Sequence, residues 1–597
     1  MPEHLFAELA AGGGSAQAVA FLEQGERARR LLLLRTLLNR LGGVPTPLNP
    51  AAEAWRVFKE AAERAPEPVE RLLLAPTTGA WIAHLLRRLH GTATGPPLWS
   101  EAGRLNILAV AASLHAGTET VLRVPLDDGA LPLPGLGLAR LPDAAAGLTE
   151  GSAHTRAGEL TLTGPGRAGR PSSLTCRPAP APIGGTPPAD TCWLPLRTLT
   201  HTTPAGPFAI PLEDLDPYRD LDDPVPPARL DDEEAAAWQR LFDEAVAILA
   251  RADGAGPGRL DPAVIRSVVP WERTGLLPPP PPDVRVSASS GDSYGAMVIA
   301  RPSSPLALAE ALVHEFQHSK LAALLHLFPL LDDDRGERHY APWRPDPRHL
   351  TGLLHGAYAF TGVAGFWRDR QSEPEHGETA AYHFALRRTQ SRLVVRTLLT
   401  SGRLTADGHG LLGGLARTLD GWLREPVDPA ALARARTAAA LHRIEWRLRN
   451  IARPARPVPD RHSVPPERDP FLSPLSAPFR LRPDRAPWPD VRTHAFAVRP
   501  ADPRTPDEHL AAGDPAAALD GYAEGLAREP GDPHLLAGWI VARGALERGP
   551  QARRLLARPE TLPWDTESLP KDAGGVPVRT PRVLPEDADG APVGHRE

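Results

Sequence analysis

The stretch SPLALAEALVHEFQHSKLAALLHLFPLL at residues 304–331 predicts more of this chain's architecture and chemistry than any other. It contains the pattern HExxH, with His314 and His318 four positions apart. On an α-helix with about 3.6 residues per turn, two side chains at that spacing point the same way. Their imidazoles can therefore share one metal ion, with Glu315 beside the open coordination position.

The sequence around this pattern favours a buried helix. Ser304 is a good N-cap, and Pro305 stands at the first helical position, where its missing N–H costs nothing. HExxH also arises by chance on helices with two ordinary histidines, but buried imidazoles without a ligand or hydrogen-bond partner would be costly. The metal site is therefore the favoured interpretation. The apolar face of the helix is formed at helical spacing by Leu308, Leu312, Val313, Phe316 and Leu321.

Two histidines leave a metal ion short of ligands, so a third ligand must come from elsewhere in the chain. His355 is the first choice, because it lies at the start of a buried-looking helix and the following glycine permits close approach of another backbone. The other interpretation of His355 is a satisfied core histidine. Glu378 is the competing ligand and would give a His/His/Glu site, which suits zinc or iron. His326 lies roughly 12 Å beyond His318 along the helix axis, too far to share the ion.

The segment YAPWRPDPR at residues 340–348 is predicted to be an extended loop, because its three prolines disfavour a helix. Arg344 and Arg348 are candidate guanidinium groups near the metal, since arginine matches a carboxylate bidentately. The loop could thus hold a co-substrate carboxylate or an acidic peptide side chain. The alternative is a surface loop with solvated arginines; Tyr340 and Trp343 favour a packed setting.

Composition limits the classes of function. The chain has 597 residues, a net charge of −5 and a pI near 6.5, which does not favour nucleic acid or an anionic membrane as the main partner. Cys176 and Cys192 form no CxxC pair, so a reducing compartment is expected. The N-terminus has no secretory pattern, and no segment approaches the ~20 apolar residues of a membrane span. We therefore expect a cytoplasmic protein.

The predicted fold class is α+β and mostly helical, with a zincin-like HExxH helix beside a β-hairpin. Composition and periodicity change along the chain at several points. The predicted regions are a helical region at 1–95, a Pro/Gly-rich β-leaning region at 96–230, a helical catalytic domain at 231–453 that includes a hairpin at 284–300, a Pro/Arg-rich linker at 454–503, tetratricopeptide-like helices at 504–560 and a disordered tail at 561–597.

Two of these regions carry interpretations of their own. An exposed strand in the hairpin at 284–300 could hold an extended peptide by main-chain pairing, although a hairpin that merely covers the helix is equally compatible. A single tetratricopeptide-like unit cannot bury its own apolar face, so it must pack on other parts of the protein. The residues that suggest this unit are Gly513, Asp514, Ala518, Tyr522, Gly525, Leu526 and Pro530.

Several blocks resemble one known family. HEFQHSKL at 314–321, APWRPDPRHLTGLLHGAYAF at 341–360 and VAGFW at 363–367 are similar to the HEXXH-motif peptide-modification family of actinobacterial ribosomal-peptide gene clusters. That module occurs alone or fused behind radical-SAM maturases of the FxSxx-COOH type. The resemblance extends to FAELAAGGG, LLLLRTLL and PTTGAWIAHLLRRL in the N-terminal part, and it covers roughly residues 1–450.

The family is regarded as iron- and 2-oxoglutarate-dependent peptide β-hydroxylases. The resemblance implies that His314 and His318 bind Fe(II), and that the PWRPDPR loop or a later helix binds 2-oxoglutarate. It also implies a ribosomally made precursor peptide as substrate, and a radical-SAM maturase as a further partner. Glu315 would then orient ligands or substrate.

Two other functions remain open from the residues themselves. The first is a zinc metallopeptidase, in which Glu315 is the general base that takes a proton from the metal-bound water. The second is a degenerate scaffold that binds a precursor peptide without catalysis. The intact histidines and glutamate of the motif make the scaffold the least favoured of the three.

Overall fold

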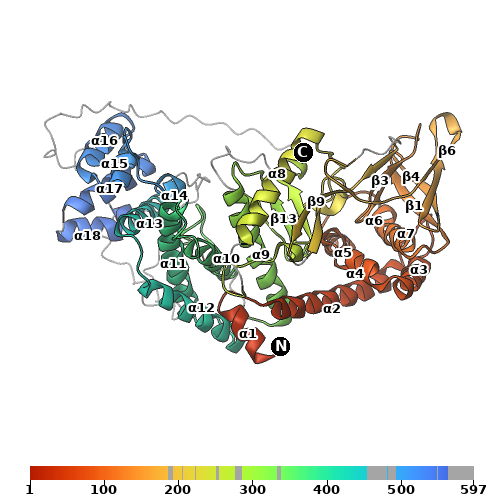
Figure 1. Cartoon of the computed structure of the whole chain (residues 1–597), viewed down its shortest axis with the longest axis horizontal. Helices are drawn as coiled ribbons and strands as arrows, with labels where there is room; N and C mark the ends of the chain where they lie inside the picture. Colours follow the sequence, from red (N-terminus) through yellow and green to blue (C-terminus); the bar gives the residue numbers. More distant parts are fainter. Residues whose placement is uncertain are drawn as a thin grey trace, which may run out of the picture. The chain divides into compact units, whose positions relative to one another are not determined.

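We analysed a computed structural model of the chain, which describes residues 1–185, 192–204, 206–221, 223–250, 254–275, 286–332, 338–452, 481, 492–547 and 549–561. The chain forms two compact units, residues 1–432 and 433–597. The proline run at 278–282, most of the predicted linker and the predicted tail beyond Thr561 lie outside the described residues. The fold is α+β, as predicted, with two sheets and many helices (Figure 1).

The N-terminal helices follow the predicted pattern. They are α1 (Glu3–Ala10), α2 (Ala16–Leu41), α3 (Ala51–Arg64), α4 (Pro66–Leu74) and α5 (Pro76–Leu89). The helices break at residue 76, because α4 ends before Pro76 and α5 begins with it. Helix α2 extends from the HExxH helix α9 (Pro305–Leu327) to α4 and α5 (Figure 1). Its first half packs in one hydrophobic core and its second half in another.

The first sheet has seven antiparallel strands in the order β6-β5-β4-β1-β2-β3-β8. Helix α7 (Arg104–Ala116) follows the short α6 (Leu98–Ala102) and covers the sheet. This helix lies inside the region predicted to be β-leaning, and nearly all of it is buried. The strands are β1 (Thr120–Asp127), β2 (Ala130–Leu133), β3 (Gly137–Arg140), β4 (Leu148–Arg156), β5 (Glu159–Pro165), β6 (Pro171–Cys176) and β8 (Trp193–Pro195). Cys176, at the end of β6, and Cys192 are both half-buried.

The second sheet is mixed, with the order β12-β13-β11-β10-β9-β7. Strands β9 and β10 belong to the predicted β-leaning region, yet β10 pairs with β11 from the predicted catalytic domain. The domain boundary that we expected at residue 230 therefore separates strands that belong to one sheet. Its strands are β7 (Ala181–Pro182), β9 (Arg197–Thr203), β10 (Gly206–Leu212), β11 (Ser267–Pro270), β12 (Ser287–Ala288) and β13 (Ala296–Ile299). Strands β12 and β13 are antiparallel, and so form the predicted hairpin.

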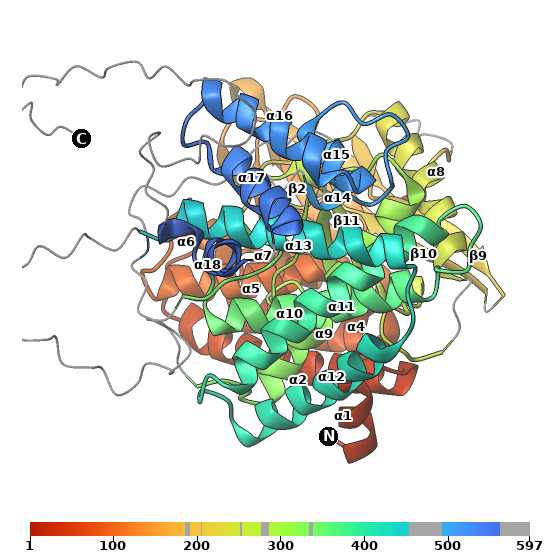
Figure 2. The same ribbon diagram turned by 90° about the vertical axis from the view of Figure 1, so that its left-hand side faces the viewer.

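Five helices complete the first unit: α8 (Asp232–Leu249), α9, α10 (Leu350–Arg368), α11 (Gly377–Leu399) and α12 (Ala406–Arg424). Helix α9 contacts α8, β12 and β13, while α10, α11 and α12 lie side by side (Figure 2). The predicted N-cap of α9 is confirmed, because the Ser304 hydroxyl accepts from the Ala307 N–H at 3.3 Å. None of the helices in the described residues is both long and apolar enough to span a bilayer.

The N-terminal glycines are held against the HExxH helix. Gln317 Nε2 donates to the Gly12 carbonyl at 2.8 Å, and Lys320 Nζ donates to the Gly13 carbonyl at 2.7 Å. A Cβ on Gly13 would lie 2.1 Å from the Ala255 carbonyl oxygen, far closer than van der Waals contact permits. Glycine is therefore needed at position 13 of the FAELAAGGG segment, because the main chain there passes closely between α9 and residues 254–258.

A Gly13→Ala substitution should therefore destabilise the first unit, by about 1–3 kcal/mol as for other overpacked sites. Denaturant unfolding followed by tryptophan fluorescence measures the effect. Gly42→Ala is the matched control, because a Cβ there meets nothing within 4 Å. Equal unfolding midpoints for the two variants would show that the N-terminal segment does not need this close passage.

The second unit is helical, with α13 (Pro429–Asn450), α14 (Arg492–Ala495), α15 (Pro506–Ala512), α16 (Pro515–Arg528), α17 (Pro533–Leu546) and α18 (Pro550–Ala557). Consecutive helices from α15 to α18 contact one another, as a helical-hairpin array requires. Helix α15 ends at Gly513, whose φ of 88° is in the left-handed region that glycine tolerates. A tetratricopeptide identity for these helices stays a prediction.

A charged network joins five helices of the second unit, α13 to α17. Arg492 donates to Glu445 at 3.0 Å and to Asp507, which also accepts from the Tyr522 hydroxyl. The His534 ring lies 3.2 Å from Asp507 and 3.4 Å from Glu445. Burial alone would lower the pKa of His534, but its hydrogen bonds to Asp507 and Glu445 outweigh burial and raise this pKa to about 8.

The charged form of His534 should therefore stabilise the second unit below pH 6.5, and this contribution should disappear as the pH rises through about 8. Hydrogen exchange of the α17 amides in the full chain, compared from pH 6 to 9 after correction for intrinsic rates, measures this. His534→Gln should remove the pH dependence, whereas substitution of the exposed His90 should leave it intact. A pH dependence that persists in His534→Gln contradicts the assignment.

Candidate metal centre

His314 and His318 face each other on α9, as their spacing predicts. Their Nε2 atoms lie 3.1 Å apart, and the two rings meet edge to face with centroids 4.7 Å apart. Together with Glu315 they form a group whose ligand atoms all lie within 4.8 Å of one another. Two imidazole nitrogens and a carboxylate are donors that zinc and iron both accept. The residues present therefore fit a metal ion of either kind.

The protonation states of His314 and His318 also favour metal binding. Burial, the charge of His318 and the charge of Arg387 hold the pKa of His314 well below its usual range. Burial lowers the pKa of His318 to about 4. Both imidazoles are therefore neutral at physiological pH, with a lone pair free for coordination. No proton has to be displaced from either ring when a cation binds.

The Glu315 side chain is held in place by a residue of the edge strand of the second sheet. Its side chain is 1% exposed, and its Oε1 atom accepts from the Ser287 hydroxyl of β12 at 2.6 Å and lies 3.9 Å from His314 Nε2. Burial raises the pKa of this carboxyl to about 7, although hydrogen bonds from Ser287 and Ser289 act in the opposite direction. The hairpin predicted to cover the HExxH helix thus also holds its glutamate.

His355 lies on the other side of the His318 ring. Its Nδ1 atom is 3.4 Å from Nδ1 of His318, whereas His314 is next to Nε2 of the same ring. The two nitrogens of an imidazole point away from each other, so in this arrangement His355 occupies the place of a partner that orients a metal-bound histidine. Burial, followed by the charge of His318, lowers the pKa of His355 to about 3. Its role as a third ligand stays a prediction.

The other ligand candidates lie elsewhere. Glu378 is exposed in the first turn of α11 and does not belong to the group of metal-capable side chains found in the described residues. His326 bonds the buried Glu26 of α2 at 2.6 Å, in keeping with the expectation that it is too far along α9 to share the ion.

The PWRPDPR loop contributes an aromatic ring rather than its arginines to the wall of the centre. Arg344 and Arg348 have side chains 48% and 39% exposed, and both pair with Asp346. Trp343 instead packs on Phe360 of α10 with centroids 4.7 Å apart. A Cβ at Gly356 would come within 2.3 Å of the Trp343 ring, so the glycine after His355 makes room for a side chain and not, as predicted from the sequence, for another backbone.

A buried arginine that the sequence did not single out lies behind the same aromatic ring. Arg387 of α11 is 6% exposed, and its guanidinium carbon lies 4.4 Å from the centre of the Phe360 ring. Phe360 in turn meets the His314 ring edge to face at 4.9 Å. The available signal was a pair of polar residues, Arg387 and Gln390, about one turn apart on a helix that also carries many apolar residues.

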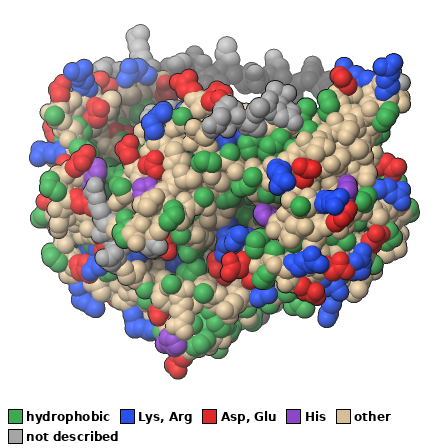
Figure 3. Space-filling view, turned by 45° about the vertical axis from the view of Figure 1, so that its right-hand side comes forward, with side chains coloured by type: hydrophobic (Ala, Val, Ile, Leu, Met, Phe, Trp, Pro, Cys, Tyr) green, Lys and Arg blue, Asp and Glu red, His purple; other side chains and the backbone are tan. Residues whose placement is uncertain are grey.

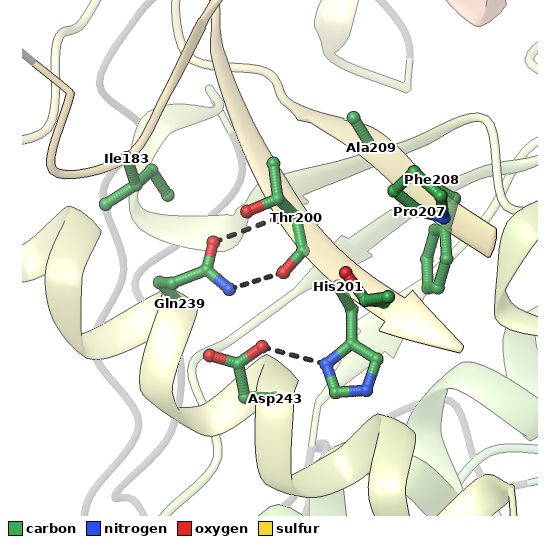
Figure 4. A pocket seen from close by; sticks show the side chains of 9 residues that line it. Ile183, Thr200, His201, Pro207, Phe208, Ala209, Gln239 and Asp243 are labelled. Atoms are coloured by element: carbon green, nitrogen blue, oxygen red, sulfur yellow. Dashed lines mark hydrogen bonds and ion pairs between the residues drawn. The ribbon is translucent and has the colours of Figure 1, made fainter. Parts of the chain in front are cut away.

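A separate hollow of about 590 Å³ lies between α8 and strand β9 (Figure 4). In it, the Gln239 amide pairs with the main-chain N–H and C=O of Thr200 at 3.0 and 2.8 Å, as a neighbouring strand would. His201 bonds Asp243 at 3.0 Å. The hollow shares no residue with the HExxH group.

On the face shown in Figure 3, acidic and basic side chains are interspersed.

Comparison with known proteins adds nothing to this geometry: no family model matches the chain, and no curated protein matches it significantly.

Metal binding tests the centre directly. His314→Ala and His318→Ala should each abolish stoichiometric binding of Fe(II) or Zn²⁺ in anaerobic titration calorimetry, because each removes a ligand. His355→Ala should weaken binding by only about 10–100-fold if it acts through His318. His326→Ala, on the same helix, is the control. Complete loss of metal binding in His355→Ala would show that His355 is itself a ligand. Unchanged metal binding by His318→Ala would disprove the proposed metal centre.

Proposed function

We propose that this chain is an iron- and 2-oxoglutarate-dependent peptide β-hydroxylase that modifies a ribosomally made precursor peptide. The observation that carries the proposal is the pair of neutral, inward-facing imidazoles of His314 and His318, with Glu315 held beside them. The family resemblance of residues 1–450 supports iron rather than zinc. Bound iron supplies the redox chemistry: 2-oxoglutarate, O₂ and a peptide C–H become succinate, CO₂ and a peptide C–OH.

The chain's own residues have distinct tasks in this reaction. His314 and His318 hold the ion, and His355 fixes the orientation of the His318 ring. Ser287 holds Glu315 in one direction, so its carboxylate orients ligands on the ion or the peptide. Strand β12 is at the edge of its sheet, where an extended peptide can pair through its main chain beside Glu315. Trp343 and Phe360 supply an apolar wall that limits access of water.

The alternative is a zinc metallopeptidase, and the position of Glu315 favours it. The Glu315 carboxylate lies 3.9 Å from Nε2 of His314, within reach of a water molecule on a shared metal. Burial raises its pKa to about 7, which suits a general base at neutral pH. In this alternative Glu315 takes a proton from the attacking water, and the peptide main chain is cleaved.

One experiment separates the two functions. Protein purified without oxygen receives Fe(II), 2-oxoglutarate and then O₂, together with short peptides encoded next to its gene. The oxygenase should form succinate and a peptide heavier by one oxygen atom, and His314→Ala should form neither. Mass spectrometry of the peptide and quantification of succinate measure both products.

Glu315→Gln is the discriminating variant, because an amide cannot act as a general base. A peptidase should lose about 10²–10⁴-fold or more in rate. An oxygenase should keep succinate formation, with a changed ratio of hydroxylated peptide to succinate. Tightly bound zinc, a cleaved peptide and no succinate would overturn the proposal in favour of the peptidase.

A further inference from the structure

We propose that the edge of strand β9 and the facing side of helix α8 form a docking groove for an extended segment of the precursor peptide, with a basic side chain of that segment placed at Asp243. The groove is the hollow of about 590 Å³ between these two elements (Figure 4). The inference rests on the proposed function for the identity of the peptide. It adds a contact with the peptide that is separate from the edge strand β12.

The outer edge of β9 is covered along only part of its length. Among the described residues, β7 pairs with residues 197–198 of β9 and no further, because the chain then turns at Gly184, whose φ is 79°. At Thr200, the Gln239 amide takes the place of the missing strand and binds both the main-chain N–H and the C=O. A side chain therefore occupies a position that the main chain of a neighbouring strand would fill.

The next residue along this edge, Thr202, presents its main-chain groups in the same direction. Residues of an antiparallel strand alternate between those that bond the partner strand and those that face away from it. Thr200 faces away from β10, because its main chain binds Gln239, so Thr202 faces away as well. The residue opposite Thr202 on β10 is Pro207, which has no N–H to donate. An extended peptide can bond these groups as an added strand.

The side chains of the groove favour a basic residue in the peptide. The Asp243 side chain is 47% exposed, and its Oδ1 atom lies 3.0 Å from Nδ1 of His201. Among the described residues, no hydrogen bond or ion pair reaches its Oδ2 atom, so that oxygen can bind a lysine or arginine of the peptide. Phe208 and Ile183, both half-buried in the same hollow, supply an apolar surface for the stem of such a side chain.

One sheet joins the groove to the candidate metal centre. Strand β12, whose Ser287 holds Glu315, lies at one edge of the second sheet, and β13, β11 and β10 separate it from β9. At a spacing of about 4.8 Å per strand, peptide strands added outside β12 and outside β9 would be roughly 29 Å apart. Spanning that distance takes about nine residues of extended chain. The docked segment must therefore lie at least about nine residues from the residue that is modified.

Binding of labelled peptides tests the groove without requiring turnover. The probes are the short peptides encoded next to the gene, labelled with fluorescein and titrated with the full chain, without metal or co-substrate, while fluorescence anisotropy is recorded. Thr202→Pro should weaken binding of a basic peptide about 2–10-fold or more, because it removes one outward N–H and its ring blocks the added strand. Pairing with β10 should survive, since that N–H faces away from β10. Thr202→Val, which keeps the main chain, is the matched control.

The charge of Asp243 supplies an independent test, which also serves if Thr202→Pro does not fold. Asp243→Lys should weaken binding of the basic peptide. Exchange of the basic residues of the peptide for glutamate, one at a time, should identify one whose exchange restores binding to this variant and weakens binding to the wild type. Glu244→Lys is the control, because Glu244 is the exposed neighbour of Asp243 on α8 and does not line the hollow.

Equal binding by Thr202→Pro and Thr202→Val, or no restoration in the charge exchange, would overturn the groove. Absence of peptide binding by the wild type would do the same, and if that peptide were nevertheless hydroxylated, the proposed function would stand. A peptide that binds at the groove but is never oxidised would support the groove and contradict the hydroxylase. If light scattering shows a dimer that Thr202→Pro dissociates, the edge pairs with a second copy of the chain and the inference is wrong.

Discussion

The approach of His314 and His318 is the interaction on which the centre depends. The helical turn brings their Nε2 atoms to 3.1 Å, but the direction of each ring and carboxylate is set by residues from other elements. Ser287 from the second sheet holds Glu315, Phe360 from α10 packs on His314, and His355 contacts the far side of His318. The geometry of the candidate centre therefore requires the sheet, α9 and α10 to be assembled together, and the motif by itself does not produce it.

Helix α9 is fixed on its rear face as well. Gln317 and Lys320 bind the Gly12–Gly13 main chain, and His326 bonds Glu26 of α2. The residues between the two histidines of the motif, and those just after it, thus hold the N-terminus of the chain. A glycine-rich segment at the N-terminus is therefore part of the support of the helix that carries His314 and His318. A rigid support of this kind keeps two ligands on one helix in register for a metal.

Local signals predicted this part of the fold well. Ser304, Pro305 and the apolar spacing indicated the start of α9. The sequence could not predict which strands share a sheet, so β10 and β11 were placed in different domains although they are paired. It also missed α7, because the proline and glycine around it dominate the composition of its region. The loop at 340–348 was singled out for Arg344 and Arg348, but its contact with the wall of the centre is made by Trp343. Arg387 was not singled out, since only tertiary packing brings α11 behind Phe360.

The electrostatic setting of the candidate centre suits both chemistries that the motif permits. Burial keeps His314 and His318 neutral, so the two imidazoles would serve an iron or a zinc ion alike. The Glu315 carboxyl, whose pKa burial raises to about 7, lies 3.9 Å from Nε2 of His314 and accepts from the Ser287 hydroxyl. The two proposed functions therefore differ in the identity of the metal and in the task of Glu315, which takes a proton in a peptidase and orients ligands in an oxygenase.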